Sequence, residues 1–163
     1  MAQLHSSYTY DSDVESVFAL IRDPAFRTES CAAQGAEQYD VTVQDDTPAG
    51  GATVTIKRQQ EADIPDFLKA LVGRLAHVRQ TEAWSAPDAD GARSARITVD
   101  ILGQPAGMKG SATLRQTPAG TEFTVEGEVK VAVPFLGRRL EPPIVDAILD
   151  SLNQDVALGT ARL

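Results

Sequence analysis

The sequence predicts an α+β fold in which a long C-terminal helix covers one curved antiparallel sheet of about seven strands. Three observations predict it. A strand pattern at the N-terminus is followed by a helix that a proline interrupts. Residues 39–56 and 75–133 then contain runs of alternating apolar and polar residues, separated by turns rich in glycine and proline. The last segment has the apolar spacing of an amphipathic helix.

The N-terminal segment predicts one strand and then a helix broken in two. Residues 4–10 alternate between two faces, as in a strand. Residues 14–21 place apolar side chains at helical spacing, and Ser12 and Glu15 fit a Ser-x-x-Glu capping box at the helix start. Asp23 is followed by Pro24, and the residue before a proline is biased out of the helical region. The first helix is therefore expected to end there, and a second short one to follow.

The central segments predict the remaining strands of the sheet. Residues 39–43 and 52–56 alternate on either side of the turn "DDTPAGG", which predicts a β-hairpin. Residues 62–74 return to helical spacing, and Gly73 fits the C-terminal cap of a short helix. Alternation resumes in the four remaining strands, which are predicted over residues 75–84, 93–102, 108–116 and 121–133.

The C-terminal segment predicts the longest helix. Its apolar residues fall on one stripe at helical spacing: Val145, Ile148, Leu149, Leu152 and Val156. Pro142 and Pro143 fit best in the first turn, where a missing amide costs least, so the helix is expected from Pro142 to Thr160. A start near Gly137, with both prolines inside the helix, is the alternative.

A sheet of this width has one apolar face to bury, and the C-terminal helix is the predicted element long enough to cover it. The broken helix is expected to close one end of the curved sheet. Because a single helix cannot fill the concave face of such a sheet, the pattern predicts a cavity between helix and sheet.

Composition excludes several classes of protein. The 163 residues are 42% hydrophobic and 23% charged, with a net charge of −8, so a nucleic-acid partner is not expected because phosphate binding needs a basic surface. No apolar run approaches the roughly 20 residues of a transmembrane segment. The N-terminus lacks the pattern of a secretory signal, and Cys31 is the only cysteine, so a cytoplasmic location is expected.

The sequence also predicts one domain over residues 1–163, because it contains neither a linker nor a repeat. No cofactor is expected, since the glycines lie in turns without the strand-to-helix context of a dinucleotide site. No metal site is expected either, because two histidines and one cysteine show no ligand spacing. Cys31 and His77 do not suggest a nucleophilic pair, as His77 falls on the strand face opposite Glu82.

The order of the segments "YTYDSDVESVFALIRDPAF", "IPDFLKALVG", "QTEAW" and "VPFLGRRLEPPIVDAIL" resembles the START-like helix-grip superfamily. This superfamily also includes the Bet v 1-like allergens and the polyketide cyclase/aromatase proteins. Within it, the chain most resembles a branch described only as a domain of unknown function. The resemblance covers nearly the whole chain, and it implies a helix-grip fold with a hydrophobic ligand cavity.

Strand parity predicts which side chains face this cavity. Glu82 and Arg58 admit three interpretations. They orient the polar group of a ligand, or Glu82 acts as a general acid or base; both reach solvent near the strand ends; or they form a structural pair. Trp84 fits a core aromatic better than a stacking platform for a ligand. The predicted ligand-binding residues are Tyr8, Ile56, Arg58, Gln80, Glu82, Trp84, Val99, Met108, Phe123, Leu149 and Leu152.

Three functions from different classes are compatible with this pattern. The first is binding or carriage of a small hydrophobic molecule, such as a lipid or a polyketide-like compound. The second is a cyclase or aromatase that uses acid/base chemistry in the same cavity, and the third is a protein-interaction domain with a filled core. An open aliphatic cavity favours the first, a cavity crossed by paired polar residues favours the second, and a filled interior favours the third.

Overall fold

The sheet is the largest element of the computed structural model, which describes residues 1–46, 48–61, 66, 69 and 73–163. It is antiparallel throughout, in the order β1-β7-β6-β5-β4-β3-β2. Each strand pairs with its sequence neighbour, except that β1 lies against β7. The helix predicted over residues 62–74 falls largely outside the described residues. The strands are β1 (Ala2–Tyr10), β2 (Gln38–Asp46), β3 (Gly51–Glu61), β4 (Leu75–Trp84), β5 (Arg93–Ile101), β6 (Ala106–Thr117) and β7 (Gly120–Val131).

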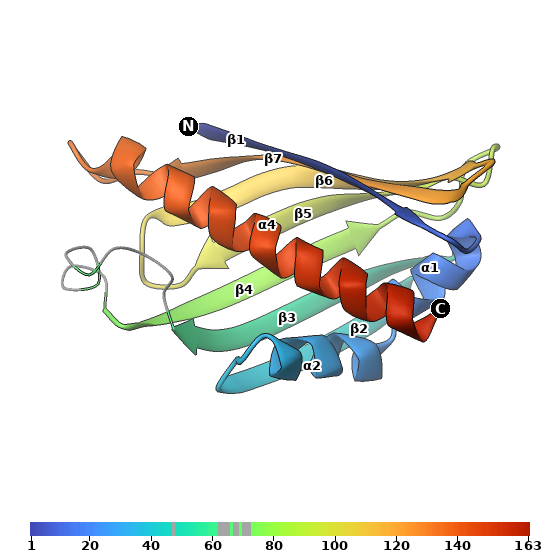
Figure 1. Cartoon of the computed structure of the whole chain (residues 1–163), viewed down its shortest axis with the longest axis horizontal. Helices are drawn as coiled ribbons and strands as arrows, with labels where there is room; N and C mark the ends of the chain where they lie inside the picture. Colours follow the sequence, from blue (N-terminus) through green and yellow to red (C-terminus); the bar gives the residue numbers. More distant parts are fainter. Residues whose placement is uncertain (47, 62–65, 67–68, 70–72) are drawn as a thin grey trace.

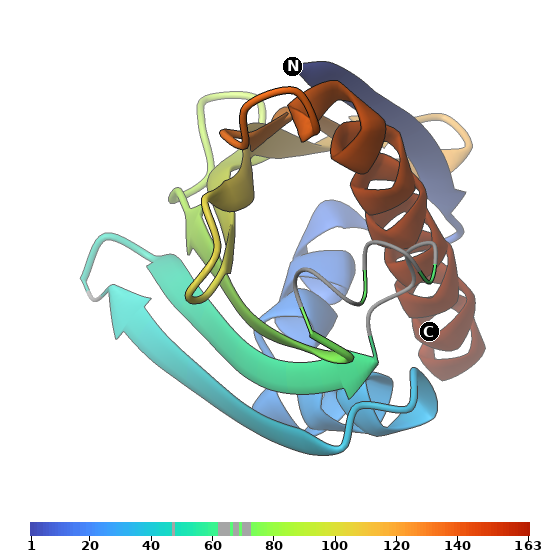
Figure 2. The same ribbon diagram turned by 90° about the vertical axis from the view of Figure 1, so that its left-hand side faces the viewer.

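Helix α4 (Gly137–Arg162) runs along the concave face of the sheet (Figure 1). Seen from one end, the sheet forms an arc, and α4 lies across its open side (Figure 2). Helices α1 (Val14–Ile21) and α2 (Pro24–Ala33) follow β1, with α1 in contact with β6 and β7 and α2 beside β2. The predicted α+β class, the break before Pro24 and the covering helix are confirmed.

The start of α1 differs from the prediction. Asp13, and not Ser12, is the N-cap, and its Oδ1 accepts a hydrogen bond of 2.7 Å from the Ser16 amide. The carbonyl oxygen of Ser12 instead accepts from the hydroxyl of buried Thr121 on β7. The predicted Ser-x-x-Glu capping box is therefore wrong: Ser12 and Asp13 are both good caps, and the contact with β7 decides between them.

Buried Arg93 joins α1 to two turns of the sheet. Its Nη2 lies 3.0 Å from the Glu15 carboxylate of α1, and its Nη1 donates to the carbonyl oxygens of Gly50 (2.8 Å) and Ser85 (3.0 Å). The guanidinium also lies 3.9 Å from the ring centroid of Phe18, which is a cation–π contact. Glu15 therefore binds an arginine of the sheet and takes no part in capping.

The start of α4 also differs from the prediction, because the helix begins at Gly137 and contains Pro142 and Pro143. Leu140, in the turn before the prolines, is buried against Val131 of β7. Glu141 accepts a hydrogen bond of 3.1 Å from the amide of Val131. These tertiary contacts stabilise the turn that precedes the prolines. Local propensity alone disfavours a helix start before Pro142, because a proline inside a helix removes a helical hydrogen bond.

The alternation of the strands is confirmed along the sheet. The register is uninterrupted within each of the six strand pairs of the described chain. Alternate residues therefore face inward along the whole length of each pair. Gly110 of β6 lies opposite Gly127 of β7 on this face. The core includes the following inward residues, all buried: Leu4, Val54, Ile56, Val78, Ile97, Leu114, Val125 and Val129.

Gly110→Ala tests the close approach of β6 and β7. A Cβ at Gly110 would overlap the backbone oxygen of Glu126, so the strands must move apart. We expect the free energy of unfolding to fall by about 1–3 kcal/mol in urea titrations. The neighbouring Ser111→Ala, on the exposed face, is the control and should change it by less than about 0.5 kcal/mol. Equal stability of the two variants would contradict this packing.

Candidate functional site

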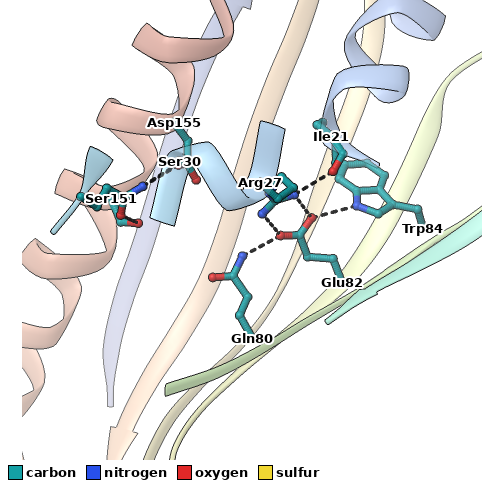
Figure 3. A network of polar contacts seen from close by, with 9 residues as sticks. Ile21, Arg27, Ser30, Gln80, Glu82, Trp84, Ser151 and Asp155 are labelled. Carbon is teal, nitrogen blue, oxygen red and sulfur yellow. Dashed lines mark hydrogen bonds and ion pairs between the residues drawn. The ribbon is translucent and has the colours of Figure 1, made fainter. Parts of the chain in front are cut away.

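A buried ion pair lies between α2 and β4 at the centre of the candidate site (Figure 3). Arg27 of α2 donates from Nη1 and Nη2 to the two carboxylate oxygens of Glu82, at 3.0 and 2.5 Å. Arg27 Nη1 also donates to the carbonyl oxygen of Ile21 at 3.1 Å. Both side chains are at least 90% buried. The paired, fork-like geometry is the strongest form of an arginine–carboxylate contact.

The Glu82 carboxylate is fully occupied by protein donors. Besides the two bonds from Arg27, it accepts from Gln80 Nε2 at 2.6 Å and from the indole nitrogen of Trp84 at 3.0 Å. Burial alone would raise the pKa of the Glu82 carboxyl, but the Arg27 charge and these hydrogen bonds outweigh burial and lower the pKa. Glu82 is therefore held as a carboxylate, and no proton is available on it for general-acid chemistry.

A pair between Glu82 and Arg58, one of the three interpretations of these residues, is not formed. Glu82 lies opposite Val54 in the β3–β4 register, whereas Arg58 lies opposite Val78. Four residues of strand, about 13 Å, separate the two positions. Glu82 does form a structural pair, but with Arg27 and not with Arg58. One sequence signal could have found Arg27: it shares the buried face of α2 with Ser30 and Cys31 at helical spacing.

A second polar cluster joins α2 to α4. The Ser30 hydroxyl and Gln34 Nε2 both donate to Oδ1 of Asp155, the latter at 2.6 Å, and Ser151 donates to Gln34 Oε1 at 2.7 Å. Burial raises the pKa of the Asp155 carboxyl; Arg27, the Ser30 hydrogen bond and Arg58 oppose this rise without cancelling it. These residues were not predicted, because they meet only when α2 and α4 pack at the same end of the sheet.

Arg58 of β3 is the other arginine of the site. Its Nε is buried and has no hydrogen-bond partner, and within the described residues no ion pair involves its guanidinium. Burial raises the pKa of Asp155 on α4 and the pKa of Cys31 on α2, and the charge of Arg58 opposes both rises without cancelling them. Arg58 is thus a cation on the inward face whose charge the described residues leave unpaired.

Three hollows lie between the sheet and α4. The inner hollow, about 70 Å³, adjoins the Arg27–Glu82 pair, and the middle hollow measures about 90 Å³. The outer hollow, about 300 Å³, reaches the β5–β6 turn, where Leu102 is exposed. Neighbouring hollows have walls in common, so they form a row. The inner and middle hollows share Arg58, Val99, Met108 and Ile148, and the middle and outer hollows share Ala76, Ile101 and Ile144.

Most of the predicted ligand-binding residues lie around the inner hollow. Three of them do not line it: Tyr8, Ile56 and Leu149. The hydroxyl of Tyr8 donates to Asn153 at 2.8 Å, and Ile56 is buried. Trp84 is a buried aromatic of the core, edge-on to Phe18, and also forms part of the wall. The eight that line the inner hollow are Arg58, Gln80, Glu82, Trp84, Val99, Met108, Phe123 and Leu152.

In the described part of the chain, no three side chains of His, Cys, Asp or Glu come together in a way that could hold a metal ion. None of the described helices combines the length and the apolar character that a membrane crossing requires.

Solved structures of other proteins have the same arrangement of sheet and helices. A STAR-related lipid transfer protein of Xanthomonas axonopodis has a TM-score of 0.61 and 15% identity, over 94% of this chain and 84% of that one. The di-domain ARO/CYC StfQ of the steffimycin biosynthetic pathway has a TM-score of 0.56 and 11% identity, over 98% of this chain and 50% of that one. The fold is that of the START-like, Bet v 1-like helix-grip proteins.

Within this class, residues 5–163 match the model of a family described as a protein of unknown function, DUF2505, and the chain belongs to that family. A relative in Mycobacterium tuberculosis, the uncharacterised protein Rv0481c, is 25% identical over 146 residues, which cover 83% of each chain. The resemblance to the START-like superfamily and to a branch of unknown function is confirmed.

Glu82→Gln tests the energetic role of the buried pair. Removing the carboxylate leaves the Arg27 guanidinium buried without a counter-charge, so we expect a loss of about 3–5 kcal/mol in the free energy of unfolding. The double variant Arg27→Met/Glu82→Gln removes both charges and should recover part of this loss. Glu122→Gln, which breaks the exposed pair with Arg115, is the control and should cost less than about 1 kcal/mol. Additive losses in the double variant would refute the coupling.

Asp155→Asn tests the effect of the buried Asp155 charge on stability. The variant keeps Oδ1 as the acceptor for Ser30 and Gln34 and removes the charge. Because the pKa of Asp155 is raised in the folded state, the wild type loses stability as the pH rises through that pKa, and the variant does not. We expect the variant to need more urea for unfolding at about pH 8, with the difference shrinking toward pH 4. A constant difference across this range would contradict the assignment.

Proposed function

We propose that this protein binds a small hydrophobic molecule in the row of hollows between the sheet and α4, within a single START-like domain over residues 1–163. The observation that carries the proposal is the row itself, which runs from the Arg27–Glu82 pair to the β5–β6 turn. The wall of the middle hollow is largely aliphatic, as binding sites for apolar molecules are. The lipid transfer protein and the ARO/CYC protein of the same fold support a ligand of lipid or polyketide-like character.

The two alternatives have less support. A cyclase or aromatase would need a group that is free to move a proton, and Glu82, the predicted candidate, is saturated with donors and has a lowered pKa. The buried pair does cross the inner hollow, but its geometry is that of a structural contact. A protein-interaction domain with a filled core fits poorly with an outer hollow of about 300 Å³, which reaches the lower end of the sizes usual for ligand pockets.

Ala147→Trp tests the proposal with the uncharged dye N-phenyl-1-naphthylamine. Ala147 of α4 lines the middle hollow, and an indole there would fill the passage between the inner and outer hollows. We expect the wild type to enhance the dye's fluorescence and the variant to bind it at least about tenfold more weakly, a loss of about 1.4 kcal/mol. Ala157→Trp, on the exposed side of the same helix, is the control and should bind like the wild type.

Circular dichroism and urea titration would establish that both variants are folded before their dye binding is compared. The proposal fails if the wild type does not bind the dye, or if folded Ala147→Trp binds it as tightly as folded Ala157→Trp.

A further inference from the structure

Two arginines and two acidic residues line the inner hollow, Arg27, Arg58, Glu82 and Asp155, but among these four only Arg27 and Glu82 form an ion pair. Arg27 is neutralised by Glu82 through two hydrogen bonds. The Asp155 carboxylate is held by Ser30 and Gln34, and no ion pair joins it to an arginine in the described structure. Arg58 is left as the cation with no counter-ion within ion-pair distance among the described residues, and its Nε is out of contact with water and without an acceptor. A buried donor without a partner is costly, and it marks a position where an acceptor is missing.

The position of Arg58 makes it accessible to a molecule in the hollows. It belongs to the shared wall of the inner and middle hollows, beside Val99, Met108 and Ile148. From there the row passes Ala76 and reaches the β5–β6 turn, about three strand spacings or 14 Å away. A ligand could therefore place an acceptor at Arg58 and extend an apolar body toward the outer hollow.

We infer that the ligand is an amphipathic monocarboxylic acid, whose carboxylate pairs with the guanidinium of Arg58 while its apolar body lies in the middle and outer hollows. This inference rests on the proposed function and adds the chemical class of the ligand. A planar carboxylate matches the guanidinium fork with two parallel hydrogen bonds. It would also satisfy the Nε that the described residues leave without an acceptor.

The acidic neighbours favour a single negative charge. Asp155 and Glu82 both line the inner hollow, so any anion at Arg58 faces two carboxyl groups. Their charges would repel a doubly charged phosphate monoester more strongly than a carboxylate. An uncharged head group would leave the Arg58 charge without a counter-ion. The arrangement thus selects a monoanion over both a neutral ligand and a dianion.

The test compares three ten-carbon probes by isothermal titration calorimetry: decanoate, 1-decanol and decyl phosphate. The wild type should bind decanoate about 10- to 100-fold more tightly than decanol, as expected for a charge-assisted hydrogen bond in a shielded site. Decyl phosphate should bind more weakly than decanoate. Arg58→Met should bind decanoate no more tightly than it binds decanol.

Two further variants separate charge from packing. Arg79→Met removes an arginine from the outer face of β4, where it pairs with Asp100, and should leave the preference for decanoate intact. Arg58→Lys keeps the charge without the planar fork and should retain a reduced preference for decanoate. If Arg58→Met proves unfolded, Arg58→Lys provides the test. The role of Arg58 is overturned if this variant prefers decanoate over decanol as strongly as the wild type does. It is also overturned if the variant no longer binds decanol at all.

The outcomes distinguish this inference from the proposed function. Binding of decanol and decanoate with equal affinity overturns the carboxylic acid and leaves the hydrophobic site standing. Tighter binding of decyl phosphate than of decanoate overturns the monoanion. Absence of binding for all three probes, together with no binding of the uncharged dye, overturns the proposed function itself.

Discussion

Arg27 and Glu82 are both removed from water, and a buried charge persists in a protein only when a partner and further hydrogen bonds replace its hydration. Glu82 meets this requirement with donors from α2 and from its own strand, and Arg27 meets it with the carboxylate and the Ile21 carbonyl oxygen. The pair therefore fixes α2 against β4, and breaking that contact would expose two charges to an apolar interior. The end of the sheet that α2 closes is set by this constraint.

The same constraint shapes the hollows. With α2 fixed, Ser30 and Gln34 are in place to hold Asp155, which joins the C-terminal half of α4 to α2. The other end of α4 is anchored separately, where Glu141 binds the Val131 amide and Leu140 packs on β7. The helix is held at both ends and lies across the open side of the sheet between them (Figure 2). The row of hollows lies beneath it, and the largest of the three adjoins its N-terminal part.

The two arginines on the inward side have opposite roles because their surroundings differ. Arg27 is enclosed by acceptors and contributes to the structure. Arg58 lies in the wall of two hollows and lacks an acceptor for its buried Nε, which makes it the group through which a ligand could be recognised. Membership of the family and likeness to proteins of the START-like fold are compatible with many ligands, because a fold does not determine the chemistry of its site. The identity of the lining charges therefore matters more than the fold.

The sequence by itself determined the inward face of the sheet, the break before Pro24 and the apolar stripe of α4, because each follows from local periodicity or from one proline. Strand parity placed Glu82, Arg58 and Gln80 on the correct face. Only the tertiary structure decided which residues meet. The partner of Glu82 comes from a helix 55 residues away and the partners of Asp155 from a helix more than 120 residues away, and sequence spacing carries no information on such contacts. The same holds for both helix starts, where contacts with β7 override local capping and proline preferences.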